Sequence, residues 1–248
     1  DRFGDAVRVT ENSDGTYTFT MPNGQVTVTA TFVQVEEPAP TEPFVDVNEG
    51  DWFYDAVVYA YQNELMDGVG GNRFAPNSET TRAQLVTILY RLEGEPAVSG
   101  DLPFTDVDEG DWFYDAVRWA YENGLMQGTA EDRFSPNATT TRAMVVTILY
   151  RLEGEPAVTG ETPFTDLVAG QYYLDAVNWA YQNGIVDGVT ATTFAPGDKI
   201  TRQQMAAILY RYAEYKGYDT SASARPLRLS RRRPGSDLCP EGHVLGRG

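Results

Sequence analysis

The chain has 248 residues, with 36 Asp plus Glu against 19 Lys plus Arg, so its formal net charge is -17 and its pI is near 4.3. This length allows one to three domains, and the acidic charge disfavours binding to nucleic acid or to an anionic membrane surface. No apolar run approaches the ~18 residues that a spanning helix needs, so we expect no membrane insertion. The single Cys239 and the single His243 exclude an internal disulfide and any mechanism that requires two histidines.

Residues 1–33 have the pattern of β-structure. Polar and apolar side chains alternate from Tyr17 to Phe32 around Asn23-Gly24, a pair that is typical of a tight hairpin turn. A lone hairpin is only marginally stable in water. We therefore interpret residues 1–33 as the C-terminal strands of a β-repeat domain, joined to the rest by a semi-rigid linker at residues 34–43.

An internal repeat of 60 residues dominates the remaining sequence. Its copies occupy residues 44–97, 104–157 and 164–218, separated by linkers at 98–103 and 158–163, and the first two copies are identical at 38 of 54 aligned positions. Each copy reads F-x-D, then D-A-V-x-x-A-Y, F-[AS]-P, T-R and I-L-Y-R. Copies this similar must share one fold.

Each copy has the periodicity of two helices. In the second copy, apolar residues recur at helical spacing from Trp112 to Tyr121, and Asn123-Gly124 then ends the helix. A loop that closes on F-[AS]-P leads to a second helix, which ends near Gly94 in the first copy. We predict an all-α fold of three helix–loop–helix units that share one core, because a single unit buries too little apolar surface.

The T-R motif is predicted to begin the second helix of each copy. Thr81, Thr141 and Thr201 are suited to accept a hydrogen bond from a free N–H of the first helical turn. Gln84 and Gln204, three residues later, can complete a capping box, whereas Met144 cannot.

Three arginines follow these caps directly: Arg82, Arg142 and Arg202. A cation at a helix N-terminus is unfavourable for the helix dipole, which calls for a compensating role. One interpretation is that each guanidinium and the free N–H groups bind one anion. The alternative is that each Arg forms an ion pair with a neighbouring carboxylate, such as Asp46, Asp106 or Asp166.

Asp51-Trp52 and Asp111-Trp112 are predicted to open the first helix of their copies. An indole can stack on a sugar ring, and a carboxylate can accept hydrogen bonds from sugar hydroxyls. The alternative is an Asp cap with a Trp in the core. The third copy has Gln171-Tyr172 here, so we expect its contribution to be weaker or altered. Trp119 and Trp179, within the helical stripe, are expected in the core.

The sequence gives no sign of catalysis, of a metal site or of a cofactor site. The segment Asp106–Asp111 looks like a calcium loop but lacks the Gly and Glu spacing of an EF-hand. The sole His lies outside the repeats, so no nucleophile–base pair for acyl transfer is available. We therefore expect a protein that is not an enzyme, with no cofactor and no metal. The alternatives that residue types alone leave open are a different calcium site in the acidic loops and, because carboxylates are abundant, a glycosidase.

The combined motifs F-x-D-V, D-W-[FY]-Y-D-A-V, F-x-P and T-R-A resemble those of the S-layer homology (SLH) family, over all three copies. The resemblance implies a pseudo-threefold assembly with a central three-helix bundle. It also implies an exported bacterial protein that is anchored at the cell wall or S-layer by binding secondary cell-wall polysaccharide, often pyruvylated, in grooves between copies. The family's T-R-A-E motif is altered here to T-R-A-Q, T-R-A-M and T-R-Q-Q.

On this basis the predicted polysaccharide-binding residues are Arg82, Arg142, Arg202, Asp51, Trp52, Asp111, Trp112 and Tyr172. The alternative function is a protein–protein scaffold that self-associates in a surface layer without binding glycan.

The C-terminal residues 219–248 differ from everything before them. Residues 225–248 contain six Arg and two acidic residues, together with the only Cys and the only His. We expect this tail to be disordered and non-native. The alternative is a functional basic tail that attracts anionic wall polymer.

Overall fold

The computed structural model describes residues 9–11, 17–19 and 44–220. In the N-terminal unit, β1 (Val9–Glu11) pairs antiparallel with β2 (Tyr17–Phe19), with Val9 opposite Phe19. The predicted strand at Tyr17 is present, but its described partner precedes it in the chain, whereas the hairpin predicted around Asn23-Gly24 lies outside the described residues. The sequence between the two strands contains Asp14-Gly15, a dipeptide that favours hairpins, and this was the available signal for the pairing.

Residues 44–220 form two helices per copy, as predicted. The first helices are α1 (Tyr54–Gln62), α3 (Tyr114–Glu122) and α5 (Leu174–Gln182), and the second helices are α2 (Arg82–Leu92), α4 (Arg142–Leu152) and α6 (Arg202–Tyr215). Each first helix begins at the Tyr or Leu that follows the predicted D-W or Q-Y pair by two residues. Asp51 therefore lies in a preceding turn, where its carbonyl accepts a hydrogen bond from the N–H of Tyr54 at 3.0 Å.

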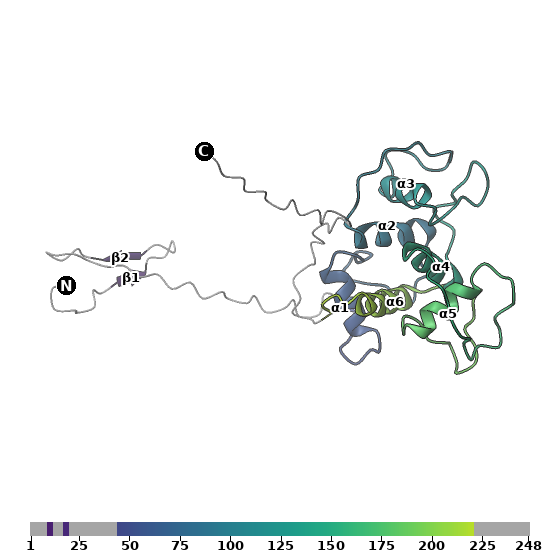
Figure 1. The fold of residues 1–248 in the computed structure, drawn as a ribbon. Coiled ribbons are helices and arrows are strands. Elements are labelled where there is room, and N and C mark those ends of the chain that lie inside the picture. The colour runs from purple at the N-terminus through teal and green to yellow at the C-terminus, as the bar shows by residue number, and fades with distance from the viewer. Residues whose placement is uncertain (1–8, 12–16, 20–43, 221–248) are drawn as a thin grey trace, which may run out of the picture. The chain divides into compact units, whose positions relative to one another are not determined.

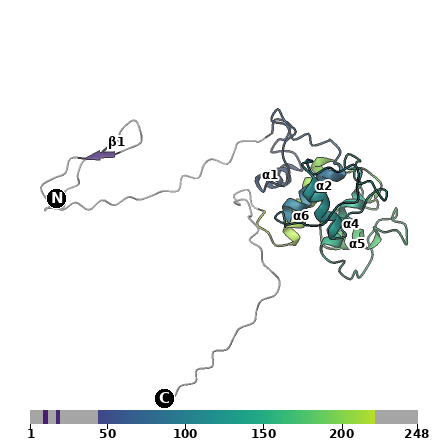
Figure 2. The same ribbon diagram turned by 90° about the horizontal axis from the view of Figure 1, so that it is seen from above.

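The helices close into a ring of pseudo-threefold symmetry. The second helix of each copy packs on the first helix of the next copy, so that α2 contacts α3, α4 contacts α5, and α6 returns to contact α1. The second helices α2, α4 and α6 form the central bundle, and α1, α3 and α5 lie around it (Figures 1 and 2). The all-α, pseudo-threefold fold predicted from the sequence is confirmed.

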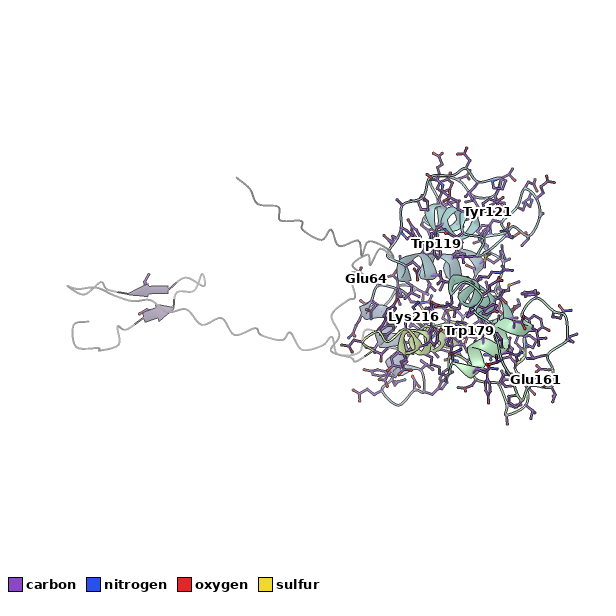
Figure 3. The ribbon with its side chains drawn as sticks, in the orientation of Figure 1. Glu64, Trp119, Tyr121, Glu161, Trp179 and Lys216 are labelled. Atoms are coloured by element: carbon purple, nitrogen blue, oxygen red, sulfur yellow. The ribbon has the colours of Figure 1, made fainter. Side chains whose placement is uncertain are left out.

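One apolar core serves all three copies. Leu85, Leu89, Leu149 and Leu209 of the central helices are fully buried. Trp119 and Trp179 lie in the interior, as predicted, where they contact tyrosines of the preceding copy's second helix (Figure 3).

The N-terminal ends of the central helices are joined by a closed set of backbone hydrogen bonds. The N–H of Thr80 donates to the carbonyl of Ile200, Thr140 donates to Thr80, and Ile200 donates to Thr140, at 2.9–3.0 Å. Because each bond links two different copies, the ring is complete only when all three copies are present.

The predicted caps are present. Thr81 and Thr201 form full capping boxes with Gln84 and Gln204, whereas Thr141 accepts a hydrogen bond from the Met144 N–H alone. The middle copy therefore lacks one capping bond, which is worth about 0.5–1 kcal/mol.

Among the described residues, the helices are all too short or too polar to cross a bilayer, and no group of three or more His, Cys, Asp or Glu side chains is placed to hold a metal ion.

Candidate functional site

The three T-R arginines each reach into the loop of another copy. Arg142 donates from Nε to the carbonyl of Phe194 at 2.8 Å and from Nη2 to the carbonyl of Asp187 at 2.8 Å. Its guanidinium carbon lies 4.6 Å from the centre of the Phe194 ring. Each Arg thus ties a second helix to the F-[AS]-P loop of the next copy around the ring.

The other two arginines repeat this arrangement. Arg82 donates to the carbonyls of Phe134 and Gln127, and Arg202 donates to those of Phe74 and Asp67. All three arginines are at most 7% exposed, and this burial lowers the pKa of each guanidinium from its ordinary value. An arginine nevertheless stays charged in proteins, so each brings a buried positive charge to the inter-copy contact.

Three aspartates that recur at the 60-residue period hold the same loops from the opposite side: Asp46, Asp106 and Asp166. The two carboxylate oxygens of Asp46 accept hydrogen bonds from the N–H groups of Phe74 and Ala75 at 2.7 and 2.9 Å. Asp106 and Asp166 make the equivalent bonds. The alternative of direct ion pairs between these carboxylates and the T-R arginines is therefore not the arrangement found within residues 44–220.

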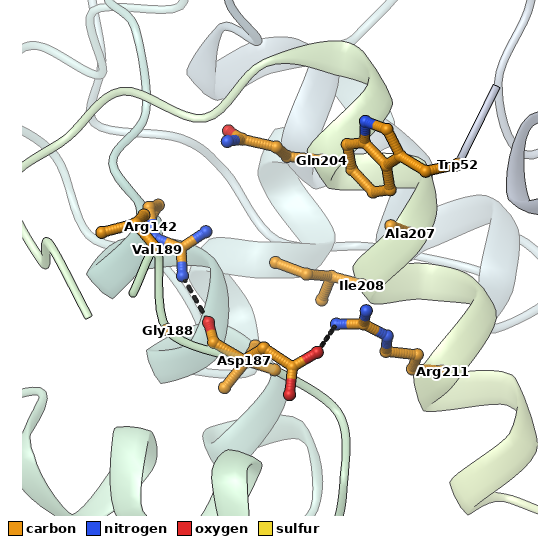
Figure 4. Close-up of a pocket in the computed structure, with 10 residues that line it drawn as sticks. Trp52, Arg142, Asp187, Gly188, Val189, Gln204, Ala207, Ile208 and Arg211 are labelled. Carbon is orange, nitrogen blue, oxygen red and sulfur yellow. Dashed lines mark hydrogen bonds and ion pairs between the residues drawn. The ribbon is translucent and has the colours of Figure 1, made fainter. Parts of the chain in front are cut away.

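A pocket of about 240 Å³ opens beside Arg142, where all three copies meet. Arg142 comes from the second copy, Asp187 and Arg211 from the third, and Trp52 from the first. Figure 4 shows Arg142 and Arg211 approaching Asp187 from two sides, with Trp52 above α6. The lining is Trp52, Arg142, Val186, Asp187, Gly188, Val189, Gln204, Ala207, Ile208 and Arg211.

An ion pair crosses this pocket. Arg211 Nη1 lies 2.9 Å from Asp187 Oδ2, while the backbone carbonyl of Asp187 accepts the bond from Arg142. Gly188 follows at a position that only glycine fits, since a Cβ there would lie 2.5 Å from the Phe164 ring and 2.6 Å from the Thr193 carbonyl oxygen. The loop that carries Asp187 is therefore held closely against its own copy.

The ring contains two further junctions of the same kind, and we number the three by their aromatic residue. The first junction has Trp52, Arg142, Asp187 and Arg211. The second has Trp112, Arg202, Asp67 and Arg91, and the third has Tyr172, Arg82, Gln127 and Arg151. At the second junction Arg91 forms an ion pair with Asp67 at 2.8 Å. A pocket of about 280 Å³ beside Trp112 is lined by Arg91 and Asp111 but by neither Arg202 nor Asp67, so it differs from the first pocket.

The three predicted aromatic residues lie on the surface. Trp52, Trp112 and Tyr172 are 65%, 66% and 58% exposed. The alternative that these side chains belong to the core is therefore wrong. Each leans edge-on against the next residue of the chain, for example Trp52 against Phe53 at 5.4 Å between ring centres, which leaves the indole accessible at its junction.

The predicted aspartates lie at these junctions in different ways. Asp51 and Asp111 each accept a hydrogen bond from a backbone N–H three residues earlier, that of Asn48 or Asp108. Asp111 lines the second pocket, whereas Asp51 is not among the residues lining the first. Neither Asp caps its helix with a side-chain hydrogen bond.

Sequence reasoning missed one set of residues, the arginines that end the I-L-Y-R motif: Arg91, Arg151 and Arg211. They recur at the 60-residue period and lie about two and a half turns after the T-R arginines on the same helix, so the spacing was the available signal. The sole Cys239 and His243 lie outside the described residues.

The junctions combine guanidinium groups, an exposed aromatic face and amide or carboxylate oxygens. Side chains of these kinds can bind an anionic ligand that contains a ring.

The described residues 44–220 thus form a repeat-built module, a closed ring of three helix–loop–helix copies with charged and aromatic junctions. Residues 43–86, 103–143 and 163–206 match the model of the S-layer homology domain. The chain belongs to this family, so its repeats form a non-catalytic anchoring module, which indicates a location at the cell surface.

Several curated proteins are similar to this chain. An endoglucanase of Bacillus sp. (strain KSM-635) is 32% identical over 67% of this chain and 18% of its own length. A surface-layer 125 kDa protein of Lysinibacillus sphaericus is 32% identical over 60% of the chain and 13% of its length. A cellulosome-anchoring protein of Acetivibrio thermocellus is 24% identical over 60% of the chain and 35% of its length. The chain thus spans only a small part of these relatives, and their names share no single activity.

Proposed function

We propose that residues 44–218 bind secondary cell-wall polysaccharide at the junctions between copies and so attach an exported bacterial protein to its envelope. The observation that carries this proposal is the first pocket, where an exposed indole and two guanidinium groups from three different copies face one space. The relatives named as surface-layer and cellulosome-anchoring proteins support the same role.

The ligand we propose is acidic, and a pyruvyl-ketal carboxylate suits the donors available. In Arg142, Nε and Nη2 bond to backbone carbonyls, whereas Nη1 makes no hydrogen bond within residues 44–220. A carboxylate could accept from that nitrogen while the sugar ring stacks on Trp52. Asp51 and Asp111 are proposed to accept hydrogen bonds from sugar hydroxyls beside the indoles.

Attraction must be local, because both the protein and this ligand carry negative charge. The net charge of -17 opposes a long-range approach by a polyanion. Contacts in a partly buried site are screened less than exposed ones. We therefore expect binding to fall only modestly with salt, unlike binding by a polybasic tail.

The test is a pull-down of the full chain on isolated cell-wall polysaccharide, with and without chemical removal of the pyruvyl groups. Replacing Trp52 and Trp112 together by Ala should weaken binding by at least about tenfold, or ~1.4 kcal/mol, because it removes two exposed stacking faces. Since these side chains are mostly exposed, the variant should stay folded, which circular dichroism checks. Val168→Ala, which trims another exposed apolar side chain (55%), is the matched control.

The proposal fails if the double Trp variant binds as well as the parent. If removal of the pyruvyl groups leaves binding unchanged, the pyruvyl carboxylate is not the group that the protein recognises. The T-R arginines are unsuitable for this test, because their hydrogen bonds hold the loops and their loss would combine unfolding with lost binding.

Self-association in a surface layer is the second candidate, supported by the relatives named as S-layer and surface-layer proteins. It requires the chain to assemble without glycan. Light scattering on glycan-free protein separates the two, since a monomer across a wide concentration range would contradict self-assembly by this chain.

A further inference from the structure

The three junctions are unequal in charge at two corresponding positions. The loop position occupied by Asp187 at the first junction and Asp67 at the second is Gln127 at the third. The position before the exposed aromatic residue is Asp51 at the first and Asp111 at the second, but Gln171 at the third. The third junction therefore lacks two carboxylates that the others carry.

This difference changes the ion-pair partner of the arginine that ends the I-L-Y-R motif. Arg211 and Arg91 each have a loop carboxylate within 2.9 Å. Arg151 instead donates from Nη1 to the backbone carbonyl of Leu125 at 3.0 Å. Its nearest carboxylate in the described part of the chain is Glu155, at 3.8 Å and more than half exposed, which is a weak contact in water.

The second cation of the third junction is Arg82. Its Nη2 bonds to the backbone carbonyl of Gln127 at 2.5 Å, and Gln127 brings no charge of its own. Arg82 and Arg151 therefore lie on two sides of one loop, residues 125–127, and each donates to a backbone carbonyl of it. Arg82 is buried and Arg151 is about one third exposed. The charged neighbour of Arg82 is Asp106, whose carboxylate already accepts the N–H groups of Phe134 and Ser135. Residues 125–127 themselves carry no carboxylate between the two guanidinium groups, which favours an added anion there.

We infer that the third junction is a distinct subsite for a saccharide segment that carries two neighbouring negative charges, whereas the first and second junctions take a segment that carries one. This inference rests on the proposed function. It adds that the third junction discriminates between ligands by the number of their negative charges. Gln127 and Gln171 are its specificity-determining residues, since each removes a repulsive carboxylate. Tyr172 supplies the ring face there in place of an indole.

The test uses two synthetic disaccharides on the same sugar backbone, one with a single pyruvyl ketal and one with two. Backbone N–H signals in nuclear magnetic resonance titrations of the full chain report each junction separately, through Trp52, Trp112 and Tyr172. At the third junction the doubly charged probe should bind about tenfold more tightly than the singly charged one. At the other two junctions we expect the ratio to stay within about twofold.

Two reciprocal variants test the residues. Gln127→Asp should pair with Arg151 as Asp67 pairs with Arg91, and should remove the tenfold preference at the third junction. Asp187→Gln should free Arg211 and create a preference for the doubly charged probe at the first junction. Ser99→Asp, which adds the same charge in the exposed connector between the first two copies, is the matched control and should change neither ratio.

The outcomes separate this inference from the proposed function. Binding of both probes with equal affinity at all three junctions, or an unchanged ratio in Gln127→Asp, overturns the inference and leaves the anchoring function intact. Failure of every junction to bind either probe overturns both. A thermal unfolding scan of each variant shows whether a lost signal reflects unfolding.

Discussion

At the scale of single residues, the loop residue Phe74 is held through both its backbone N–H and its backbone carbonyl. The N–H of Phe74 donates to Asp46 of its own copy, and its carbonyl accepts from Arg202 of the third copy, both at 2.7 Å. The ring of Phe74 also lies 4.4 Å from the Arg202 guanidinium carbon. The T-R arginine is therefore a structural clamp, and any ligand contact that it makes is additional to that role.

Asp46, whose carboxylate holds the Phe74 N–H, should make the stability of the protein depend on pH. Burial alone would raise the pKa of Asp46, but hydrogen bonds from the Phe74 and Ala75 N–H groups and from Arg73 lower it below its ordinary value of 3.8. The stabilisation is therefore present above pH 3.8 and is lost as the pH falls through the lowered pKa.

Asp46→Asn should accordingly destabilise the protein by about 1–3 kcal/mol at pH 7, with the difference shrinking below about pH 4. Urea unfolding of both proteins at pH 7, 5 and 3 measures this. Glu49→Gln, at an exposed position, is the control and should show no such trend. A difference that stays constant with pH would mean that the charge of Asp46 is unimportant.

At the scale of elements, the first helix of every copy ends in the same backbone conformation, although the residue after the C-cap is Gly in two copies and Glu in one. Gly124 and Gly184 follow the C-caps of α3 and α5 with φ of 66° and 70°, and Glu64 takes the same left-handed conformation after α1 with φ of 57°. Glu64 stands where the other two copies have glycine, the residue that most readily takes this conformation. The backbone nevertheless repeats it, because the bonds that close the helix, such as Leu65 N–H to the Ala60 carbonyl at 2.8 Å, are the same in each copy.

Glu64→Gly should therefore stabilise the protein by about 0.5–1 kcal/mol, since glycine adopts a positive φ without a Cβ clash. The Arg91 bond at this point goes to the backbone carbonyl of residue 64, so the substitution keeps it. The midpoint of chemical denaturation checks the gain, and Gly124→Ala should show a loss of similar size. A destabilised Glu64→Gly variant would contradict this account of the helix end.

At the scale of the whole molecule, stability depends on closing the ring. The packing of α6 on α1 and the hydrogen bonds among Thr80, Thr140 and Ile200 join the third copy to the first. Every T-R arginine also bonds to a loop of another copy, at sequence separations as large as 135 residues. If one copy were missing, each of the two remaining copies would lose its interface with that copy.

A chain ended at residue 158, which lacks the third copy, should therefore lose most of its helical signal rather than one third of it. The first two copies would lose the contacts of α1 with α6 and of α4 with α5. Circular dichroism with urea unfolding measures this, and a chain ended at residue 220 is the control, which should unfold in one transition. Retention of two thirds of the helical signal, with a cooperative transition, would show that the copies fold independently.

The sequence by itself determined the features that depend on neighbours a few residues apart. The number of copies, the two helices in each, the Thr81 and Thr201 capping boxes and the incomplete cap at Met144 all follow from periodicity and short-range hydrogen bonding. Only the tertiary structure decided which copies meet at each junction. It also brought Arg211 to Asp187, exposed Trp52 while burying Arg142, and left Arg151 without a loop carboxylate. These contacts join residues of different copies, so the closure of the ring sets them and no local pattern specifies them.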